Sequence, residues 1–342
     1  MTILAAQAGP AEVRFAVFMA CIAAAIGGGY VARRAGLLRP SWAGRIMSVA
    51  IVVCDAPIAC LAIWHLEIPP GVWKVPAAGA AAGVATCLAG LWVARLRRMA
   101  PADAAVFGLQ GGMGNVGYTL GGCLCFALWG IQGLALEQMF CLMWPFFSFL
   151  FCFPVARHYG EAAGGPSPRV SGLAYAARTL WQSLTDIRSL PLYLATLGLM
   201  LNLRGTTPPQ AIGQWHVLDV LMVAGVFMQF GGVGMTVEAR RLPVFWKKAL
   251  GSAAIKFVLS PLVMLAVALA LGLSGEPLYV CLLLAAMPTA LYSVLMANLF
   301  GLNKDLANAT FILTHVICLG AILAGLAAWK IAGAGNLFAP GG

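Results

Sequence analysis

Ionisable and hydrogen-bonding side chains inside long apolar runs are the residues of this sequence that could do chemistry. Asp55 lies in VVCDAPIACL and Lys256 in AIKFVLSPL, while Asn115 and His315 lie in two further apolar runs. An ionisable group costs free energy inside a bilayer, so it usually marks a binding site or an ion pathway. The chemistry that we expect is the binding and movement of an ion.

Each of these side chains also has a simpler structural explanation. Asp55 could carry a coupling proton, bind a cation, or stay protonated and hydrogen-bond to a neighbouring helix. Lys256 could neutralise an anionic substrate, pair with Asp55, or extend its stem to the membrane surface. His315 could relay a proton or serve as a packed hydrogen-bonding group. The sequence leaves these alternatives open.

Two apolar segments of membrane-spanning length are interrupted by residues that break helices. The first, Gln110–Gly130, has glycines at 111, 112, 114 and 117, so we predict two half-helices that meet around Gly114–Gly117. The second, Leu282–Gly301, contains Pro288, which removes a backbone hydrogen bond and clashes with the preceding turn. Broken helices survive at membrane depth only where their freed backbone groups face protein or a wet cavity. Paired interruptions in two halves of a chain are typical of a transporter site.

A helix that restarts presents unpaired N–H groups and the positive end of its dipole, which together suit an anion. If the two restarts face each other at the midplane, they would cradle a carboxylate. The alternative is that the proline only kinks its helix and that the glycines only allow close packing. The residues that we expect to bind the substrate are Asn115, Gly117, Tyr118, Thr119, Pro288, Thr289 and Tyr292.

The composition places these residues in a membrane. Of the 342 residues, 61% are hydrophobic and 9% are charged, which excludes a soluble domain. The net charge of +10 comes from short basic clusters between apolar runs, so it predicts membrane topology and not a nucleic-acid partner. The ten cysteines lie in apolar runs without a CxxC motif, so we expect no disulfide, no metal and no other cofactor.

The apolar runs accommodate about ten spans. The predicted spans are 14–32, 46–66, 72–94, 104–130 (broken), 133–156, 189–204, 216–238, 248–273, 276–300 (broken) and 305–331. A polar segment, 158–188, separates a first five-helix repeat at 1–157 from a second at 189–342. Because five is an odd number, the two repeats must lie in opposite orientations. We therefore predict an all-α integral membrane protein of about ten transmembrane helices, built as inverted repeats with broken crossover helices 4 and 9.

Basic residues concentrate on one side of this predicted topology. By the positive-inside rule their connections are cytoplasmic, so both termini are extracytoplasmic and the chain is a multi-pass protein of the cell (inner) membrane. Four acidic residues near span ends, Glu137, Asp219, Glu238 and Glu276, are expected to be solvated. The basic residues of these connections are Arg33, Arg34, Arg39, Arg45, Arg95, Arg97, Arg98, Arg157, Arg169, Arg178, Arg188, Arg240, Arg241, Lys247, Lys248 and Lys304.

Three blocks of sequence carry a family resemblance. They are GGGYVARRAGLLRPSWAGRIMSVAIVVCDAPI (27–58), GNVGYTLGG (114–122), and KFVLSPL (256–262) with AAMPTALYSVLMANLFGLNKDLANATFI (285–312). In this order they resemble the auxin efflux carrier family, which contains plant auxin carriers and bacterial permeases such as malonate transporters. The resemblance covers nearly the whole chain outside the central segment. The proline that usually follows the family's Asn-x-Gly is absent here, with Gly121 and Gly122 near its place, and Asp55 has no assignable counterpart.

The resemblance implies a ten-helix fold of inverted repeats, like that of bile acid symporters and sodium/proton antiporters, whose crossover helices move in an elevator-type cycle. It also implies a secondary transporter of a small organic anion, such as a malonate-like dicarboxylate or an auxin-like aromatic acid. By motif, Asn115 and Pro288 match the family's crossover positions, and Lys256 matches a basic position of its eighth span. The expected partners are the substrate anion and the lipid bilayer, with protons or sodium as candidate coupling ions and a homodimer as a candidate assembly.

Two other classes of function compete with this one. A cation/proton antiporter on the same fold would use Asp55, but it would need several acids at the crossing, and neither interruption contains one. An intramembrane aspartyl protease would need two carboxylates in one site, and no second aspartate lies deep in a predicted span. The nucleophile motif of serine hydrolases is also missing. We therefore expect a transporter and not an enzyme.

Overall fold

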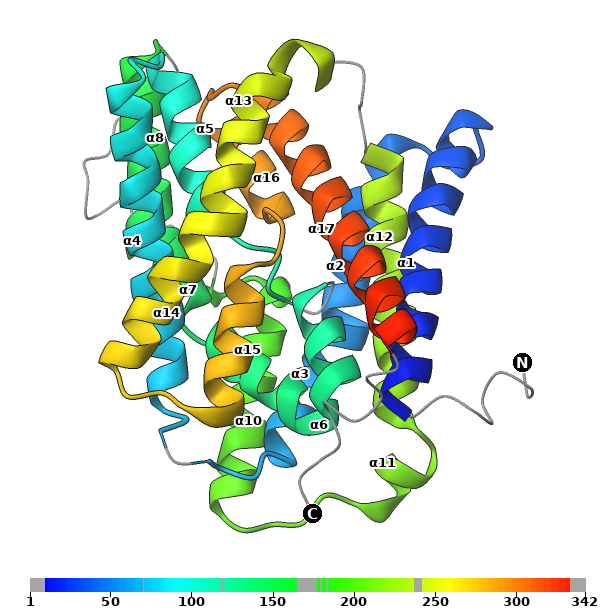
Figure 1. Ribbon diagram of the computed structural model, residues 1–342. Helices are drawn as coiled ribbons and strands as arrows, with labels where there is room; N and C mark the ends of the chain where they lie inside the picture. The colour runs from blue at the N-terminus through cyan, green and yellow to red at the C-terminus, as the bar shows by residue number, and fades with distance from the viewer. Residues whose placement is uncertain are drawn as a thin grey trace.

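Helices make up the regular secondary structure of the computed structural model, which describes residues 10–69, 71–117, 120–164, 177–178, 180–182, 184–236 and 242–332 (Figure 1). In these ranges, extended backbone pairs only at one isolated bridge. Six helical stretches of the described residues are long and apolar enough to cross a membrane: Val17–Arg34, Ala43–Trp64, Lys74–Leu96, Gly121–Ala162, Val217–Thr236 and Pro243–Ala270.

One set of helices, which we call the scaffold group, packs around α1 and α12. α1 lies along α12, α2 also contacts α12, and α10 lies along α3. Glycine permits the closest of these approaches, since a Cβ at Gly29 of α1 would lie 2.1 Å from the carbonyl oxygen of Gly231 on α12. The scaffold group consists of α1 (Pro10–Arg34), α2 (Ala43–Ala50), α3 (Ala56–Trp64), α10 (Leu190–Leu203) and α12 (Val217–Thr236).

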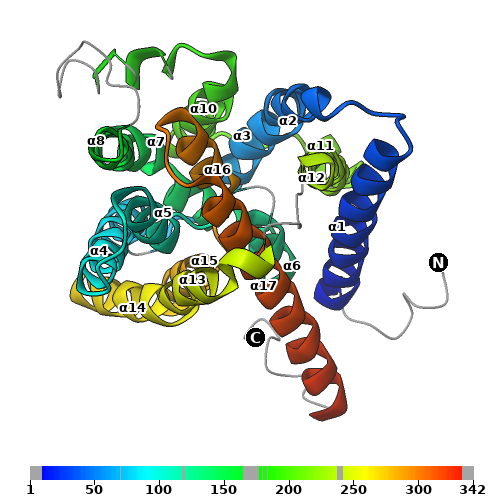
Figure 2. The same ribbon diagram turned by 90° about the horizontal axis from the view of Figure 1, so that it is seen from above.

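The remaining long helices form a second set, which we call the core group. Viewed from above, α4, α5, α13 and α14 lie on the opposite side of the molecule from α1, α2 and α12 (Figure 2). α6 connects the two groups, because it contacts α1 and α3, and Phe126 packs its ring edge-on against Phe18. The core group consists of α4 (Lys74–Leu96), α5 (Pro101–Gly112), α6 (Gly121–Cys141), α8 (Phe153–Ala162), α13 (Leu242–Ala254), α14 (Ser260–Ala270), α15 (Gly275–Ala285), α16 (Leu291–Leu299) and α17 (Lys304–Ala332).

Three spans widen into π-helix just before a proline. A proline cannot donate the hydrogen bond of an α-helical turn, and a wider turn accommodates that loss. Asp55 lies in the first of these segments and Lys256 in the third, so both ionisable side chains project where their helices are irregular. The segments are η2 (Ile51–Asp55) before Pro57, η3 (Phe147–Cys152) before Pro154, and η6 (Ile255–Leu259) before Pro261. The shorter elements are η1 (Pro40–Trp42), α7 (Trp144–Phe146), η4 (Ile187–Ser189) and α11 (Gln210–Gln214).

α6 is two helical segments joined by a reversal at Gly130, where φ is 62° and ψ is −144°. The segments run back to back, since a Cβ at Gly133 would lie 2.5 Å from the carbonyl oxygen of Cys125. This hairpin carries Glu137 back to the beginning of α6, where its carboxylate lies against Gly122. Glu137 is therefore 0% exposed, and the prediction that it is solvated is wrong.

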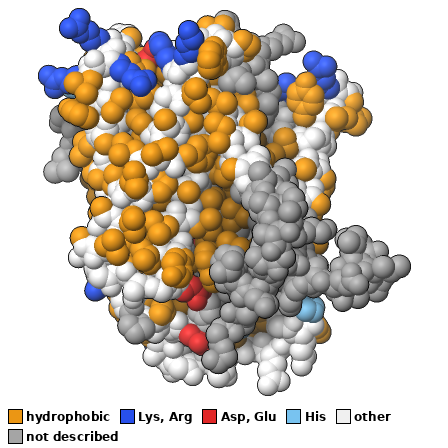
Figure 3. Space-filling view, in the orientation of Figure 1, with side chains coloured by type: hydrophobic (Ala, Val, Ile, Leu, Met, Phe, Trp, Pro, Cys, Tyr) orange, Lys and Arg blue, Asp and Glu red, His pale blue; other side chains and the backbone are white. Residues whose placement is uncertain are grey.

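Lys and Arg gather at one end of the molecule, at the top of Figure 3, above a belt of apolar side chains. We call this end the basic end. It includes the last turn of α1 with Arg33 and Arg34, the last turn of α4 with Arg95, and the first half of α13 with Lys247 and Lys248. The predicted positions of the two termini, Glu238, and residues 165–176, 179 and 183 of the central segment lie outside the described residues.

Candidate functional site

Both predicted interruptions are breaks in the helices. Residues 113–120 separate α5 from α6, and residues 286–290 separate α15 from α16. The explanation that Pro288 only kinks its helix is therefore insufficient. The glycines that precede and follow Asn115 leave the first break without a helical hydrogen-bond ladder, and Pro288 does the same in the second.

The two breaks pair with each other as a short antiparallel bridge between Gly114 and Thr289. The N–H of Asn115 donates to the carbonyl of Pro288 over 2.6 Å. On the other side of the bridge, the N–H of Ala290 donates to the carbonyl of Met113 over 2.9 Å. Backbone groups that the breaks set free are thus satisfied by each other inside the protein.

The helices that end at the breaks are capped by side chains of one neighbouring span. Lys256 Nζ lies 3.5 Å from the carbonyl of Gly111 in the last turn of α5, and Ser260 Oγ donates to the carbonyl of Ala285 at the end of α15 over 3.0 Å. The carbonyls at a helix C-terminus carry partial negative charge, which an ammonium group complements. Side chains of the protein therefore satisfy carbonyls at the C-terminal ends of both half-helices.

Lys256 is a buried cation, with 1% of its surface exposed. Of the described residues, no carboxylate lies within ion-pair distance of it, so it neither pairs with Asp55 nor reaches the membrane surface. Its ammonium adjoins Gly114 and lines a cavity of about 20 Å³ together with Gly112 and Ser260. A cavity of this size holds a water-sized group. An unpaired cation beside the breaks makes this region attractive to an anion.

The helices that begin at the breaks differ from each other. At α6, the N–H groups of Gly121 and Gly122 donate to the carbonyls of Asn115 and Gly117, over 3.2 and 2.9 Å, so this start is closed by its own loop. At α16, none of the described residues accepts a hydrogen bond from the N–H of Leu291 or Tyr292. The open helix start is that of α16.

His315 of α17 is brought to Asn115. The Asn115 amide donates to His315 Nε2 over 3.2 Å, and Nδ1 lies 2.8 Å from the carbonyl of Phe311. An amide N–H needs an acceptor and a carbonyl needs a donor, so this arrangement selects the neutral tautomer with its proton on Nδ1. His315 therefore orients the Asn115 amide.

Two residues that we predicted to bind the substrate make other contacts. The hydroxyl and N–H of Thr289 lie 3.0 and 3.2 Å from the Thr314 hydroxyl, and Thr289 is fully buried, so its side chain holds the break in place. The Tyr292 ring stacks on Phe153 of α8, with centroids 5.9 Å apart, so its side chain packs against α8. The carbonyls of Gly117 and Pro288 accept backbone hydrogen bonds at the breaks. Tyr118 and Thr119 lie outside the described residues.

Asp55 is not at the breaks. It is buried in the scaffold group, where the Gln229 amide of α12 donates to both of its carboxylate oxygens, over 2.9 and 3.0 Å. Glu137 of the core group is held by the Gln138 amide and by the Cys141 thiol, which is 3.0 Å away. The carboxyl groups of Asp55 and Glu137 are close enough for their charges to interact. The hairpin glycine at 130 is the sequence signal that could have placed Glu137 at depth.

Polar contacts that sequence reasoning missed hold the core group together. Gln110 donates to the hydroxyl of Ser293 over 3.2 Å and to the carbonyl of Ala307 over 2.9 Å, which joins α5 to α16 and α17. At the basic end, Asp103 of α5 accepts hydrogen bonds from Lys248 of α13 and from Asn303, which precedes α17. These partners are far apart in sequence, and no local pattern pairs them.

Sequence comparisons give the relatives of this chain. A family model described as membrane transport protein matches residues 209–324, which include α15, α16 and Lys256. A Rhizobium meliloti protein with the inferred name malonate transporter is 28% identical over 232 residues, which cover 66% of this chain and 68% of that protein. An Oryza sativa subsp. japonica protein with the inferred name auxin efflux carrier component 9 is 26% identical over 164 residues, which cover 46% of this chain and 37% of that protein. These matches confirm the resemblance of this chain to the auxin efflux carrier family of membrane transporters.

Proposed function

We propose that this protein is a secondary transporter of small organic anions and that the anion binds at the paired breaks. The observation that carries the proposal is the bridge between Gly114 and Thr289, because it brings the two interrupted helices into contact. Around this bridge the C-terminal helix ends are capped and the start of α16 is open. An open helix start with a buried cation nearby suits a carboxylate.

The proposed contacts of the carboxylate follow from this arrangement. Its oxygens accept from the N–H groups of Leu291 and Tyr292 and from the amide of Asn115, which His315 orients. Lys256 adds a positive charge next to the bridge, where it adjoins Gly114. Neutral donors with one buried cation suit a small carboxylate.

The names of the relatives support two substrate classes. The bacterial relative is named for malonate, a small dicarboxylate, and the plant relative for auxin, an aromatic acid. Both carry the carboxylate that the α16 start would bind. Malonate and indole-3-acetate are therefore the substrates to test first.

The arrangement of helices supports an elevator-type cycle in an inverted ten-helix fold. Both breaks and their caps belong to the core group, while α1, α2, α3, α10 and α12 form a separate packed group. In the proposed cycle the core group carries the anion past the scaffold group. In this proposal the protein spans the cell (inner) membrane, and its basic end faces the cytoplasm, as the positive-inside rule predicts.

Proton coupling is the second function that a specific observation favours. Asp55 and Glu137 are buried, interact electrostatically, and have no basic partner among the described residues. Buried carboxylates without a counter-charge are held neutral by a proton or a bound cation. Asp55 belongs to the scaffold group and Glu137 to the core group. If both carboxyl groups became charged, their repulsion would therefore act between the two groups. An antiporter that exchanges only cations and protons would use the same pair.

Counterflow in proteoliposomes tests the proposal. Purified protein is reconstituted with unlabelled malonate inside, and entry of radiolabelled malonate is followed, with indole-3-acetate in a parallel set. We expect accumulation that unlabelled substrate inhibits. Proton release or sodium entry without any carboxylate counterflow would instead support the cation/proton antiporter.

A further inference from the structure

α10 alone is shorter than the hydrocarbon core of a membrane. It has 14 residues, which span about 21 Å, against a hydrocarbon core of about 30 Å. It packs along α3, in the lower part of Figure 1 and away from the basic end. The chain that leads into α10 must therefore enter the membrane from the basic end before the helix begins.

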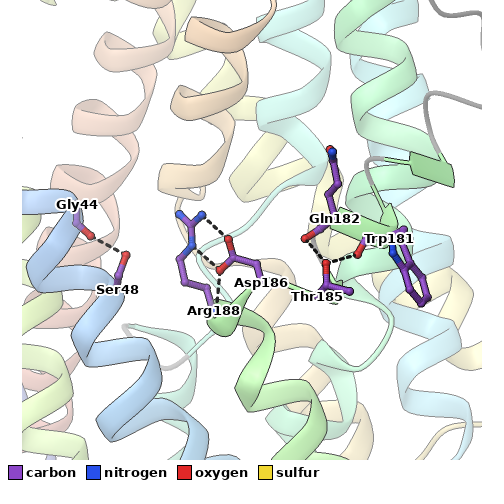
Figure 4. Close-up of polar contacts among 7 residues, drawn as sticks. All are labelled: Gly44, Ser48, Trp181, Gln182, Thr185, Asp186 and Arg188. Atoms are coloured by element: carbon purple, nitrogen blue, oxygen red, sulfur yellow. Dashed lines mark hydrogen bonds and ion pairs between the residues drawn. The ribbon is translucent and has the colours of Figure 1, made fainter.

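That entering chain contains Asp186 and η4, which lie below the basic end. η4 contacts η2, whose first residue lies about 12 Å along its helix from Ala43, the first residue of α2. In Figure 4, Asp186 and Arg188 lie at the level of Gly44 and Ser48 of α2. An ion pair of the central segment is thus sunk within the depth of the scaffold group.

Arg188 and Asp186 form a forked ion pair. Arg188 Nε and Nη2 donate to the two oxygens of Asp186 over 2.8 and 2.6 Å, and the Arg188 N–H donates to the same carboxylate over 2.8 Å. The side chains remain 58% and 32% exposed, respectively. A charged pair this deep and this exposed is stable in contact with water and costly in contact with lipid. We therefore place the pair on a water-accessible path from the basic end.

This path leads toward the candidate site. The Arg188 guanidinium is close enough to the Tyr292 phenol for the two groups to interact electrostatically. Tyr292 is the second residue of α16, and its N–H is one of the two open donors described above. Arg188 thus lies within electrostatic range of Tyr292, whose N–H belongs to the helix start that would hold the carboxylate.

We propose that Arg188 captures the substrate carboxylate at the basic end and that Asp186 occupies the guanidinium until the substrate displaces it. Arginine matches a carboxylate with two parallel hydrogen bonds, so a substrate carboxylate can replace Asp186 in the same geometry. The positive charge of the basic end raises the local anion concentration and favours this exchange. This inference rests on the proposed function, because it names the entry point to the same site.

Two substitutions have opposite expected effects. Asp186→Asn keeps an oxygen that can accept from the Arg188 N–H but removes the competing charge, so the KM for malonate should fall about threefold to tenfold. Arg188→Gln should raise the KM about tenfold with little change in kcat. If the pair only ties the loop together, both variants should lower Tm and neither should lower KM. That result would overturn the proposal.

The measurement uses membrane vesicles of both orientations, with radiolabelled malonate as the probe. We expect the KM changes in inside-out vesicles, which present the basic end to the medium, and not in right-side-out vesicles. Equal changes in both orientations would contradict capture at the basic end. Glu161→Gln is the matched control, because Glu161 pairs with Arg157 at the basic end over 2.8 Å and is 34% exposed. Its KM should equal that of the wild type.

Failure of this inference can be told apart from failure of the proposed function. If wild-type protein transports malonate, Asn115→Ala abolishes that transport, and both Arg188→Gln and Asp186→Asn behave as wild type, only the capture role is refuted. If wild-type protein transports neither malonate nor indole-3-acetate, the proposed function fails and the capture role fails with it.

Discussion

The N–H of Asn115 and the carbonyl of Pro288, which belong to different interrupted helices, are joined by a hydrogen bond of 2.6 Å. Asn115 supplies a backbone donor to the second break, and Pro288 supplies a backbone acceptor to the first. Next to this contact the Asn115 amide donates to His315, and the N–H groups of Leu291 and Tyr292 have no acceptor among the described residues. The two helix breaks therefore form one structural unit.

Gly114→Ala should destabilise this unit. Its Cβ would lie 2.9 Å from Lys256 Nζ and 3.2 Å from Val116 Cγ1, so Lys256 must move away from the α5 carbonyl that it caps. We expect a loss of roughly 1–3 kcal/mol, seen as a lower Tm of the purified protein. Gly28→Ala on α1 is the control, because a Cβ there would meet no described atom within 4 Å. Equal Tm values for the two variants would contradict the packing described around Gly114.

Lys256→Met should separate stability from transport. Methionine fills a similar volume without a buried charge, so we expect Tm to stay the same or rise. Transport of malonate should fall at least about tenfold, because the cation near the bridge is lost. The measurements are thermal unfolding and counterflow on the same preparation. A variant with wild-type flux would show that Lys256 only caps α5.

Asp55→Asn should flatten the pH dependence of flux. Asparagine keeps the contact with Gln229 but cannot exchange a proton, so a coupling proton would have no carrier in the scaffold group. Glu137→Gln should have the same effect, because the two carboxyl groups interact. Uptake is measured over a series of pH values, with Asp219→Asn, whose carboxylate lies 3.5 Å from His216 at the start of α12, as the control. A pH profile that neither buried substitution alters would leave both groups with a purely structural role.

The Arg188 contribution to KM should not depend on pH in the physiological range. Hydrogen bonds from the Arg188 side chain and backbone lower the pKa of Asp186 to about 2. Because the pKa of Asp186 is depressed, its carboxylate is fully ionised and paired at any pH above the ordinary carboxyl pKa. The ion pair is lost only as pH falls through about 2. The ratio of the Asp186→Asn KM to the wild-type KM should therefore be constant between about pH 5 and pH 8. A ratio that changes across this range would show that another group titrates with the pair.

Local sequence signals predicted the elements of the site well. Glycines around Asn115 and the proline at 288 break helices for reasons contained within a few residues, and the breaks lie where these residues stand. Asp55 and Lys256 stood out because charges are rare in apolar runs, and both are buried. These predictions depend only on short-range sterics and on the cost of burying charge.

Long-range partners could not be predicted in this way. Asp55 lies beside Gln229 and not Lys256, and Asn115 lies beside His315, because packing of whole helices decides which side chains meet. Glu137 was misplaced because its depth depends on the reversal at Gly130, which a hydropathy pattern does not locate to within one turn. A single sequence shows which residues are present, but it does not show which of them lie close together in the fold.

Binding of radiolabelled malonate to purified Asn115→Ala protein tests the central claim most directly. Asn298→Ala is the comparison, because the Asn298 amide donates to the carbonyl of Val294 within α16 and lies outside the breaks. Loss of the Asn115 donor should weaken binding roughly tenfold to a hundredfold at unchanged Tm, while Asn298→Ala should bind as wild type. Equal affinity of both variants would contradict the proposal that the paired breaks hold the anion.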